Sequence, residues 1–298
     1  MTSAIETEGL TKDYGQHRGI FDLSLEVSQG EAFGFIGPNG AGKTTTLRLL
    51  MDLIRPDRGR TLIMGMDAQR DGVRIRRSIG YLPGESPDYP NHSGERILDL
   101  LAHLRGGVDS QRVTELASMF DLDLQQKYRD YSHGNKQKVW LIQAFMSNPQ
   151  LLLLDEPTTG LDPLMQQVFR DLVKEARNRG ATVFLSSHVL PEVQEICDRI
   201  AVVHDGTLRQ VGTMEELRIS HVRRITATVE KPVDAERLTK VHGVDGVLVS
   251  DHHLECTVTG TMEPLLEALL PSVVLTLDSA EMSLEEVFLS QYGRAAQS

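Results

Sequence analysis

The apolar residues of this chain fall into short runs that alternate with glycine-rich and polar stretches. Residues 5–10 and 19–27 are predicted to form two early strands, and the second alternates apolar residues at positions 21, 23, 25 and 27 with polar ones. Segments such as residues 44–51 have helical character. Because parallel strands joined by helices form a doubly wound sheet, we predict an α/β fold that binds ligands beyond the carboxyl edge of its sheet. Further strands are predicted within residues 31–36, 60–64, 79–85, 151–157 and 182–188.

The spacing of apolar residues divides the chain further. Between residues 87 and about 149, leucines and alanines recur at helical spacing, which predicts a helical subdomain inserted into the α/β core. A capping box at residues 213–216 is expected to close a first domain of residues 1–218. Alternation returns in residues 219–298, which we expect to form a small α+β domain whose last helix begins at Ser283.

The segment Gly37-Pro-Asn-Gly-Ala-Gly-Lys-Thr-Thr45 fits the pattern of glycine, four residues and Gly-Lys-Thr. It lies between a predicted buried strand and a predicted helix, where backbone N–H groups can turn onto a polyphosphate at the helix N-terminus. We expect Lys43 to reach the β- and γ-phosphates and the Thr44 hydroxyl to ligate Mg²⁺. The loop residues assigned to nucleotide binding are Gly37, Pro38, Asn39, Gly40, Ala41, Gly42, Lys43, Thr44 and Thr45.

Two adjacent carboxylates end the apolar run of residues 151–157. Apolar neighbours cannot neutralise such charges, so a bound cation or a proton transfer is the expected reason for their position. We assign Asp155 to the Mg²⁺ shell and Glu156 to orienting or deprotonating the attacking water. His188 ends the next strand and is expected on the same sheet edge as Lys43. These residues together predict a site that hydrolyses a nucleotide.

Two further signals are ambiguous by themselves. Tyr14 lies between the first two strands, where it is either a base-stacking ring or an ordinary loop aromatic. Ser132 occupies the N-cap position of a predicted helix, so its hydroxyl and the following N–H groups offer a second anion-binding helix end. Serine is a common cap, and Ser132 becomes informative only beside the phosphate loop and the carboxylates.

Acidic side chains outnumber basic ones by 42 to 31, which gives a net charge of −11. Binding to a phosphate backbone needs a cationic surface, so nucleic acid is not the expected partner. Cys197 and Cys256 have neither metal-ligand nor redox spacing and are expected in the core. We find no apolar run of membrane-spanning length, and expect a cytoplasmic protein that reaches a membrane only through another protein.

With these residues assembled, residues 1 to about 217 resemble the nucleotide-binding subunit of ATP-binding cassette (ABC) transporters. That family has a P-loop NTPase fold with a mostly parallel core sheet, N-terminal antiparallel strands and an inserted helical subdomain. Tyr14 matches its adenine-stacking aromatic residue. The matching motifs are the Walker A loop (37–45), the cassette signature (132–135), the Walker B strand (151–156), the D-loop (160–163) and the switch histidine (His188).

The resemblance implies that two copies close head to tail around ATP and Mg²⁺. Each ATP would lie between Lys43 of one subunit and Ser132 and Gly134 of the facing one, and Asp162 would connect the two sites. His188 would contact the γ-phosphate and hold the water. The facing helix end would stabilise the transition state in trans, as an arginine finger does in other nucleotidases.

The chain departs from the family pattern at two motifs. His133 replaces the first glycine of the signature, and the form Tyr-Ser-x-Gly-Asn-Lys-Gln resembles that of drug and antibiotic exporters whose permease is a separate chain. Gly84 stands where the family usually has a glutamine that touches Mg²⁺. We expect the next residue, Glu85, to take over part of that role, either directly or through water. The following residues, 86–92, with Tyr89 and Pro90 exposed, are the expected permease contact.

These observations predict the ATPase subunit of an exporter, acting as a homodimer on a separate integral-membrane permease at the inner face of the cell membrane. Two alternatives remain, namely a soluble cassette ATPase that acts on ribosomes or DNA, and an importer ATPase, which shares every ATP-handling residue. An interaction module with an inactive site is disfavoured because Lys43, Asp155, Glu156 and His188 are all present. The C-terminal domain is expected to cover the cassette surface, to strengthen the homodimer or to gate access of ATP.

Overall fold

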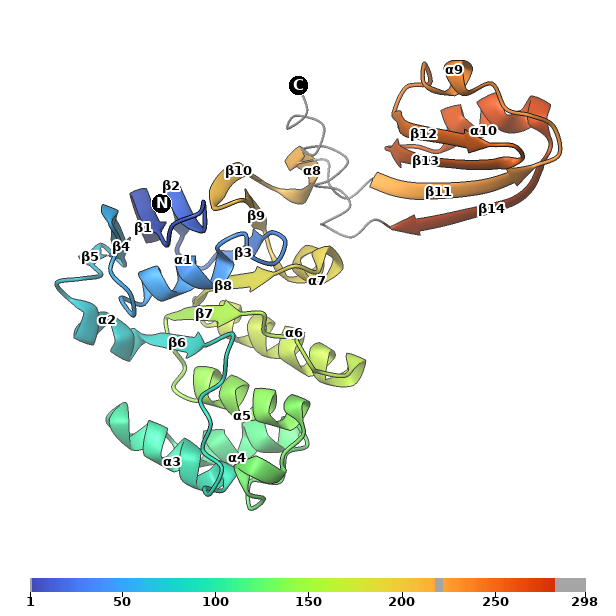
Figure 1. Cartoon of the computed structure of the whole chain (residues 1–298). Coiled ribbons are helices and arrows are strands. Elements are labelled where there is room, and N and C mark those ends of the chain that lie inside the picture. Colours follow the sequence, from blue (N-terminus) through green and yellow to red (C-terminus); the bar gives the residue numbers. More distant parts are fainter. Residues whose placement is uncertain (1, 218–221, 282–298) are drawn as a thin grey trace. The chain divides into compact units, whose positions relative to one another are not determined.

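The computed structural model describes residues 2–217 and 222–281 (Figure 1). The chain divides into two compact units, residues 1–211 and 212–298. The capping box predicted at residues 213–216 is present, because Thr213 N–H donates to the Glu216 carboxylate and Glu216 N–H donates to the Thr213 hydroxyl. The short helix that it starts, α8 (Met214–Leu217), groups with the second unit, whereas the sequence places it at the end of the first domain.

A six-stranded sheet forms the centre of the first unit, in the order β10-β9-β3-β8-β7-β6. Neighbours from β9 to β6 are parallel. Every residue of β3, β7 and β8 is buried, because both faces of the sheet are covered, and this explains the continuous apolar runs. The strands are β3 (Ala32–Ile36), β6 (Ile79–Leu82), β7 (Leu151–Asp155), β8 (Thr182–Ser187), β9 (Arg199–His204) and β10 (Thr207–Gly212).

A second, antiparallel sheet has the order β2-β1-β4-β5. Helix α1 (Lys43–Leu50) contacts β7 on one side and β2 and β4 on the other, so it lies between the two sheets. Strand β4 begins two residues before the predicted strand of residues 60–64, because Arg58 already pairs with Thr11 across the sheet. The strands are β1 (Ser3–Asp13), β2 (Gly19–Ser28), β4 (Arg58–Ile63) and β5 (Met66–Asp67).

The inserted subdomain is helical from Gly94 onward, after a loop that follows β6. In that loop Tyr89 is partly buried, with its ring centroid 6.1 Å from that of Trp140, so the expectation that Tyr89 is exposed is wrong; Pro90 is exposed. The helices of the first unit are α1, α2 (Gly72–Ser78), α3 (Gly94–Leu104), α4 (Ser110–Met119), η1 (Tyr128–Asp130), α5 (His133–Phe145), α6 (Pro163–Asn178) and α7 (Leu190–Ile196). Among the described residues, no helix is long and apolar enough to cross a membrane.

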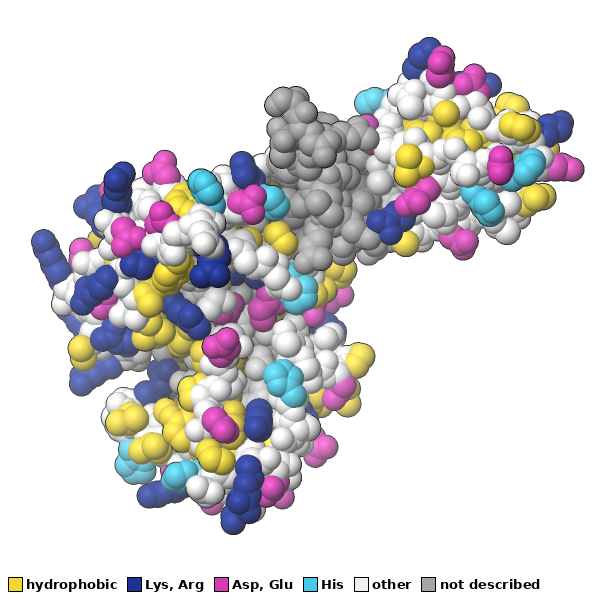
Figure 2. Space-filling view, viewed as in Figure 1, with side chains coloured by type: hydrophobic (Ala, Val, Ile, Leu, Met, Phe, Trp, Pro, Cys, Tyr) yellow, Lys and Arg dark blue, Asp and Glu magenta, His cyan; other side chains and the backbone are white. Residues whose placement is uncertain are grey.

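Basic side chains gather at the edge of the first unit formed by β4, β5 and α2 (Figure 2). Acidic partners neutralise part of this charge. The Arg60 guanidinium binds both carboxylate oxygens of Glu8, at 2.8 and 2.6 Å, and Arg76 lies 3.7 Å from Asp52. Ion pairs therefore run through this edge, which is not a uniform cationic surface.

The second unit has the element order β-α-β-β-α-β, and its antiparallel strands lie in the order β12-β13-β11-β14. This is a ferredoxin-like arrangement. The predicted alternation is confirmed where Ile225, Ala227 and Cys256 are buried, and Cys197 of the first unit is buried as well. The elements are β11 (Val222–Val229), α9 (Ala235–Leu238), β12 (Val244–Ser250), β13 (His253–Thr259), α10 (Glu263–Leu269), η3 (Leu270–Ser272) and β14 (Val274–Glu281). The last helix predicted from Ser283 lies outside the described residues.

Candidate functional site

The glycine loop connects the carboxyl end of β3 to the N-terminus of α1. Gly42 has φ +100° at the N-cap of α1, and a Cβ there would lie 2.4 Å from Ile20 Cδ1 and 2.8 Å from the Gly19 carbonyl oxygen. Only glycine fits this position without displacing β2. The first turn of α1 contains no acidic residue, so its N–H groups and the helix dipole present a positive end that suits an anion.

Lys43 begins α1, and its side chain is only 6% exposed. The ammonium group donates hydrogen bonds to the carbonyl oxygens of Gly37 at 2.7 Å and Pro38 at 3.2 Å. It also forms an ion pair with Glu156 Oε1 at 3.2 Å. Lys43 is therefore held at the mouth of the glycine loop, in contact with Glu156.

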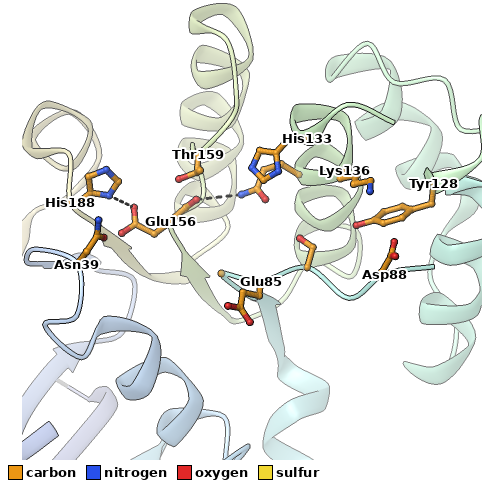
Figure 3. A pocket seen from close by; sticks show the side chains of 12 residues that line it. Asn39, Glu85, Asp88, Tyr128, His133, Lys136, Glu156, Thr159 and His188 are labelled. Carbon is orange, nitrogen blue, oxygen red and sulfur yellow. Dashed lines mark hydrogen bonds and ion pairs between the residues drawn. The ribbon is translucent and has the colours of Figure 1, made fainter. Parts of the chain in front are cut away.

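Glu156 directly follows β7, and its second carboxylate oxygen lies 2.8 Å from His188 Nδ1 (Figure 3). Its backbone has φ +49°, a left-handed conformation that costs a non-glycine residue about 1–2 kcal/mol. Hydrogen bonds hold this conformation, because Glu156 N–H donates to the Ser186 carbonyl at 3.2 Å. Lys43, Glu156 and His188 thus form one connected array at the carboxyl edge of the parallel sheet.

Asp155 is the last residue of β7 and is only 1% exposed. Its Oδ1 accepts a hydrogen bond from the Ser186 hydroxyl at 2.5 Å, whereas Oδ2 is buried and has no hydrogen-bond partner within the described residues. Burial raises the pKa of the neighbouring Tyr81 to about 12, and the negative charge of Asp155 adds to the rise. A buried carboxylate oxygen without a donor suits a cation, so the site fits the Mg²⁺ expected from the sequence.

The loop after β6 meets this carboxylate through Gly84. A Cβ on Gly84 would lie 2.6 Å from Asp155 Oδ2, so the close approach requires glycine. Glu85 is 93% exposed on its side chain, which lies 3.9 Å from Arg48. The structure therefore places the backbone of residue 84, and not the Glu85 carboxylate, against Asp155. Thr44 is the second residue of α1 and is partly buried.

The signature segment forms the start of α5. Ser132 is its N-cap, and the hydroxyl accepts a hydrogen bond from Asn135 N–H at 3.2 Å, as the sequence predicts. Ser132 is exposed and Gly134 is partly buried. One helical turn later, Gln137 Nε2 donates to the carbonyl oxygens of Glu156 at 3.3 Å and Pro157 at 3.1 Å. This side chain joins the signature helix to the strand end that carries the carboxylates.

A cavity of about 580 Å³ opens between the strand ends and the helical subdomain (Figure 3). Asn39 of the glycine loop, Glu156 and His188 line one side of it, and His133 and Lys136 of α5 line another. Residues from the loop after β6 complete the lining, Glu85 among them. Tyr128 of η1 also borders the cavity.

Two other predicted residues lie on separate elements. Tyr14 is 48% exposed, and Lys12 Nζ lies 5.9 Å from its ring centroid. Asp162 is the N-cap of α6, because its Oδ1 accepts a hydrogen bond from Met165 N–H at 3.0 Å. The sequence predicts that Asp162 connects the two sites, and it does not predict this capping role. The cap holds the Asp162 side chain in a defined position.

Several residues that hold the array have no recognisable signature in the sequence. Besides Ser186 and Gln137, they are Thr158 and Ser187, whose hydroxyls both donate to the Glu192 carboxylate. Single serines and threonines at strand ends are common. What distinguishes these residues is their hydrogen bonding between elements, because Ser186 bonds from β8 to β7, Gln137 from α5 to the end of β7, and Thr158 and Ser187 both bond to α7.

The sequence and the fold were compared with known proteins. A family model described as "ABC transporter" matches residues 20–159. The bacitracin transport ATP-binding protein BcrA of Enterococcus faecalis is 36% identical, in an alignment that covers 75% of this chain and 72% of BcrA. The daunorubicin/doxorubicin resistance ATP-binding protein DrrA of Streptomyces peucetius is 32% identical, in an alignment that covers 99% of this chain and 94% of DrrA. This chain belongs to the ABC transporter ATP-binding proteins.

Solved structures of ABC proteins share the fold. The structure of an ATP-binding subunit of an ABC transporter superimposes with a TM-score of 0.68 at 31% identity and covers 72% of this chain and 92% of its own. A dimeric ATP-binding cassette in a post-hydrolysis state, bound to ADP and phosphate, gives a TM-score of 0.65 at 23% identity and covers 70% of this chain and 98% of its own.

As a member of the ABC family, the chain is an ATPase that binds ATP together with Mg²⁺. The predicted cassette fold is confirmed. The site has the parts that the reaction needs, namely a phosphate loop with its lysine, a buried carboxylate suited to a cation, and a second carboxylate in contact with a histidine.

Proposed function

We propose that this chain is the ATPase subunit of an exporter, in which two copies bind ATP at composite sites and drive a separate membrane permease. The observation that carries the proposal is the connected array of Lys43, Glu156 and His188 at the sheet edge, in a chain whose capped signature helix presents an exposed Ser132. BcrA is named for bacitracin transport and DrrA for daunorubicin and doxorubicin resistance, which supports drug- or antibiotic-like cargo.

Each residue of the array has a distinct role in this proposal. Lys43 and the loop N–H groups bind the terminal phosphates, and Glu156 accepts a proton from the attacking water. His188 holds that water and Glu156 in place through its ring nitrogens. Asp155 and Thr44 are the residues that would hold Mg²⁺, which neutralises phosphate charge when bound.

The remaining contacts come from outside this core. Tyr14 stacks on adenine, and Ser132 with Gly134 of a facing copy approaches the phosphate. Asp162 connects the two sites of the dimer. Glu85 is exposed on the cavity wall, so its role toward the metal is an indirect one, through water. The loop at residues 86–92 is the proposed permease contact, which would hold the protein at the cytoplasmic face of the membrane.

The hydrolytic role of Glu156 is tested by measuring ATPase activity of the purified Glu156→Gln variant. Glutamine keeps the size of the side chain but is not a base, so we expect activity to fall at least about a hundredfold. Glu195→Gln is a suitable control, because Glu195 is an exposed acid on α7 that pairs with Arg170 at 3.1 Å. Wild-type activity in E156Q would refute the assignment.

The head-to-tail arrangement is tested by mixing two inactive variants. Lys43→Ala and Ser132→Ala each damage both sites of their own homodimer. In a mixed dimer, one site receives both damaged residues and the other receives Lys43 and Ser132 intact. Equal mixing should therefore restore about a quarter of wild-type activity if the sites act independently. A mixture as inactive as its components would exclude the composite site.

The permease is tested by purifying tagged E156Q from detergent-solubilised host cells in the presence of ATP. Co-purification of one multi-span membrane protein would support a transporter and would provide the chain that determines cargo and direction. Recovery of ribosomal or DNA-associated proteins would favour an ATPase that acts away from transport. An importer would instead co-purify with a permease whose transport assay shows uptake.

A further inference from the structure

One carboxylate on α7 joins the two strand ends that carry the hydrolytic residues. Glu192 Oε2 accepts a hydrogen bond from the Thr158 hydroxyl at 2.5 Å and another from the Ser187 hydroxyl at 3.3 Å. Both hydroxyl-bearing residues are buried, and Glu192 itself is partly buried. Glu192 is absent from the cavity lining and belongs to a layer behind the array.

The position of the two hydroxyls in the chain gives this contact its importance. Thr158 lies two residues after Glu156, in the loop that leaves β7, and Ser187 lies one residue before His188, at the end of β8. The Ser187 hydroxyl also accepts a hydrogen bond from Val189 N–H at 2.9 Å, which fixes the turn around His188. Glu192 therefore links the two backbone segments that present the Glu156 and His188 side chains to each other.

Such a link is needed because Glu156 has a costly backbone conformation. A left-handed non-glycine residue is maintained only when its surroundings hold it from several sides. Ser186 fixes the Glu156 N–H, and Gln137 binds its carbonyl oxygen. Gln137 also binds the Pro157 carbonyl oxygen, and Glu192 continues this support at Thr158, the next residue of the loop.

We propose that Glu192 is a positioning residue for hydrolysis, whose carboxylate fixes the spacing between the loops that carry Glu156 and His188. The inference rests on the proposed function, because it takes this pair to act on the attacking water. Loss of the carboxylate removes the acceptor of the buried Thr158 hydroxyl and leaves the Ser187 hydroxyl with the Val189 carbonyl at 3.5 Å, which frees the two loops to separate. The nucleotide-binding residues on β3 and α1 are untouched.

The first test compares Glu192→Ala with Glu195→Ala, an exposed acid on the same helix that pairs with Arg170. Displacements of about 1 Å at a hydrolytic pair can cost up to about a hundredfold in rate, so kcat of E192A should fall at least about tenfold. KM for ATP should stay within about twofold, because the phosphate loop is intact. E195A should match wild type in both constants, with folding of each variant checked by circular dichroism.

The second test changes the partner and keeps the carboxylate. Thr158→Val removes the hydroxyl with little change in volume and should lower kcat, whereas Thr158→Ser keeps the hydroxyl and should retain it. The double variant E192A/T158V should be no slower than the slower single variant, because both substitutions remove the same contact. The pair of T158V and T158S also decides the question if E192A fails to fold.

The inference is overturned if folded E192A has the kcat of E195A, if the two substitutions add fully, or if only KM changes. A failure of the proposed function would look different, since E156Q would then hydrolyse ATP at the wild-type rate. Inactive E156Q together with fully active E192A would remove the positioning role alone.

Discussion

Replacing Ser186 with alanine tests whether a buried charge depends on one hydroxyl. That hydroxyl donates to Asp155 Oδ1 at 2.5 Å and accepts from Glu156 N–H at 3.2 Å. Because Asp155 Oδ2 has no hydrogen-bond partner among the described residues, alanine leaves neither carboxylate oxygen with a hydroxyl donor. The Glu156 N–H keeps the Ser186 carbonyl at 3.2 Å, so the loss concerns mainly Asp155.

The size of the effect follows from the charge. A hydrogen bond to a charged group stabilises a protein by about 1.5–3 kcal/mol, whereas one between neutral groups contributes about 1 kcal/mol. We therefore expect Ser186→Ala to lower the free energy of unfolding by about 2–3 kcal/mol. Ser78→Ala is the matched control, because its hydroxyl donates to the neutral Ile75 carbonyl at 2.8 Å, and it should cost about 1 kcal/mol or less.

Urea unfolding followed by tryptophan fluorescence measures this difference in the first unit. Trp140 is the one tryptophan of the chain, and it is buried in α5 of that unit. The two variants should shift the midpoint without changing the slope of free energy against urea, since neither alters the surface exposed on unfolding. A loss in S186A no larger than that in S78A would refute the view that Asp155 is held as a buried charge by this hydroxyl.

Three further predictions follow from the same geometry. Gly42→Ala, at φ +100° and in close contact with β2, should weaken ATP binding at least about tenfold by calorimetry, whereas Gly107→Ala, at φ +104° in open space, should leave affinity unchanged. Ser132→Ala and Ser93→Ala each remove an N-cap hydroxyl and should each lower the free energy of unfolding in urea by about 1 kcal/mol. We expect only S132A to lose ATPase activity. An equal loss of activity in both variants would show that Ser132 is a purely structural cap. Burial raises the pKa of Cys256 from 9.0 to about 11, so its thiol should stay unreactive toward a chromogenic disulfide at pH 8. The free energy of unfolding should fall as pH rises from 9.0 to about 11, because the thiol of the unfolded chain ionises first. Rapid labelling of the native protein at pH 8 would contradict this.

Local signals in the sequence were sufficient for most of the cassette. Continuous apolar runs predict β3, β7 and β8 because strands covered on both faces need apolar residues at every position. Glycine spacing with a following lysine predicts the phosphate loop, and adjacent acids after an apolar run predict the strand end at Asp155 and Glu156. The serine before the signature helix is likewise confirmed as its cap.

Contacts between distant segments could not be predicted in the same way. The bonds of Ser186 and Glu192 depend on which strands are neighbours and on their register, which no local pattern encodes. The sequence predicts an exposed Tyr89, yet its ring packs on Trp140. Similarly, Gly84 and Glu85 are adjacent in sequence, and only the structure shows which of them approaches Asp155.

The ion pair between Lys43 and Glu156 sets up a competition for one positive charge. A phosphate group that reaches the Lys43 ammonium competes with the carboxylate that already lies 3.2 Å from it. Arrival of the anion thereby weakens the hold of Lys43 on the Glu156 carboxylate. By the same reasoning, E156Q removes a competitor as well as a base, and this variant should hold the nucleotide more tightly than wild type for electrostatic reasons alone.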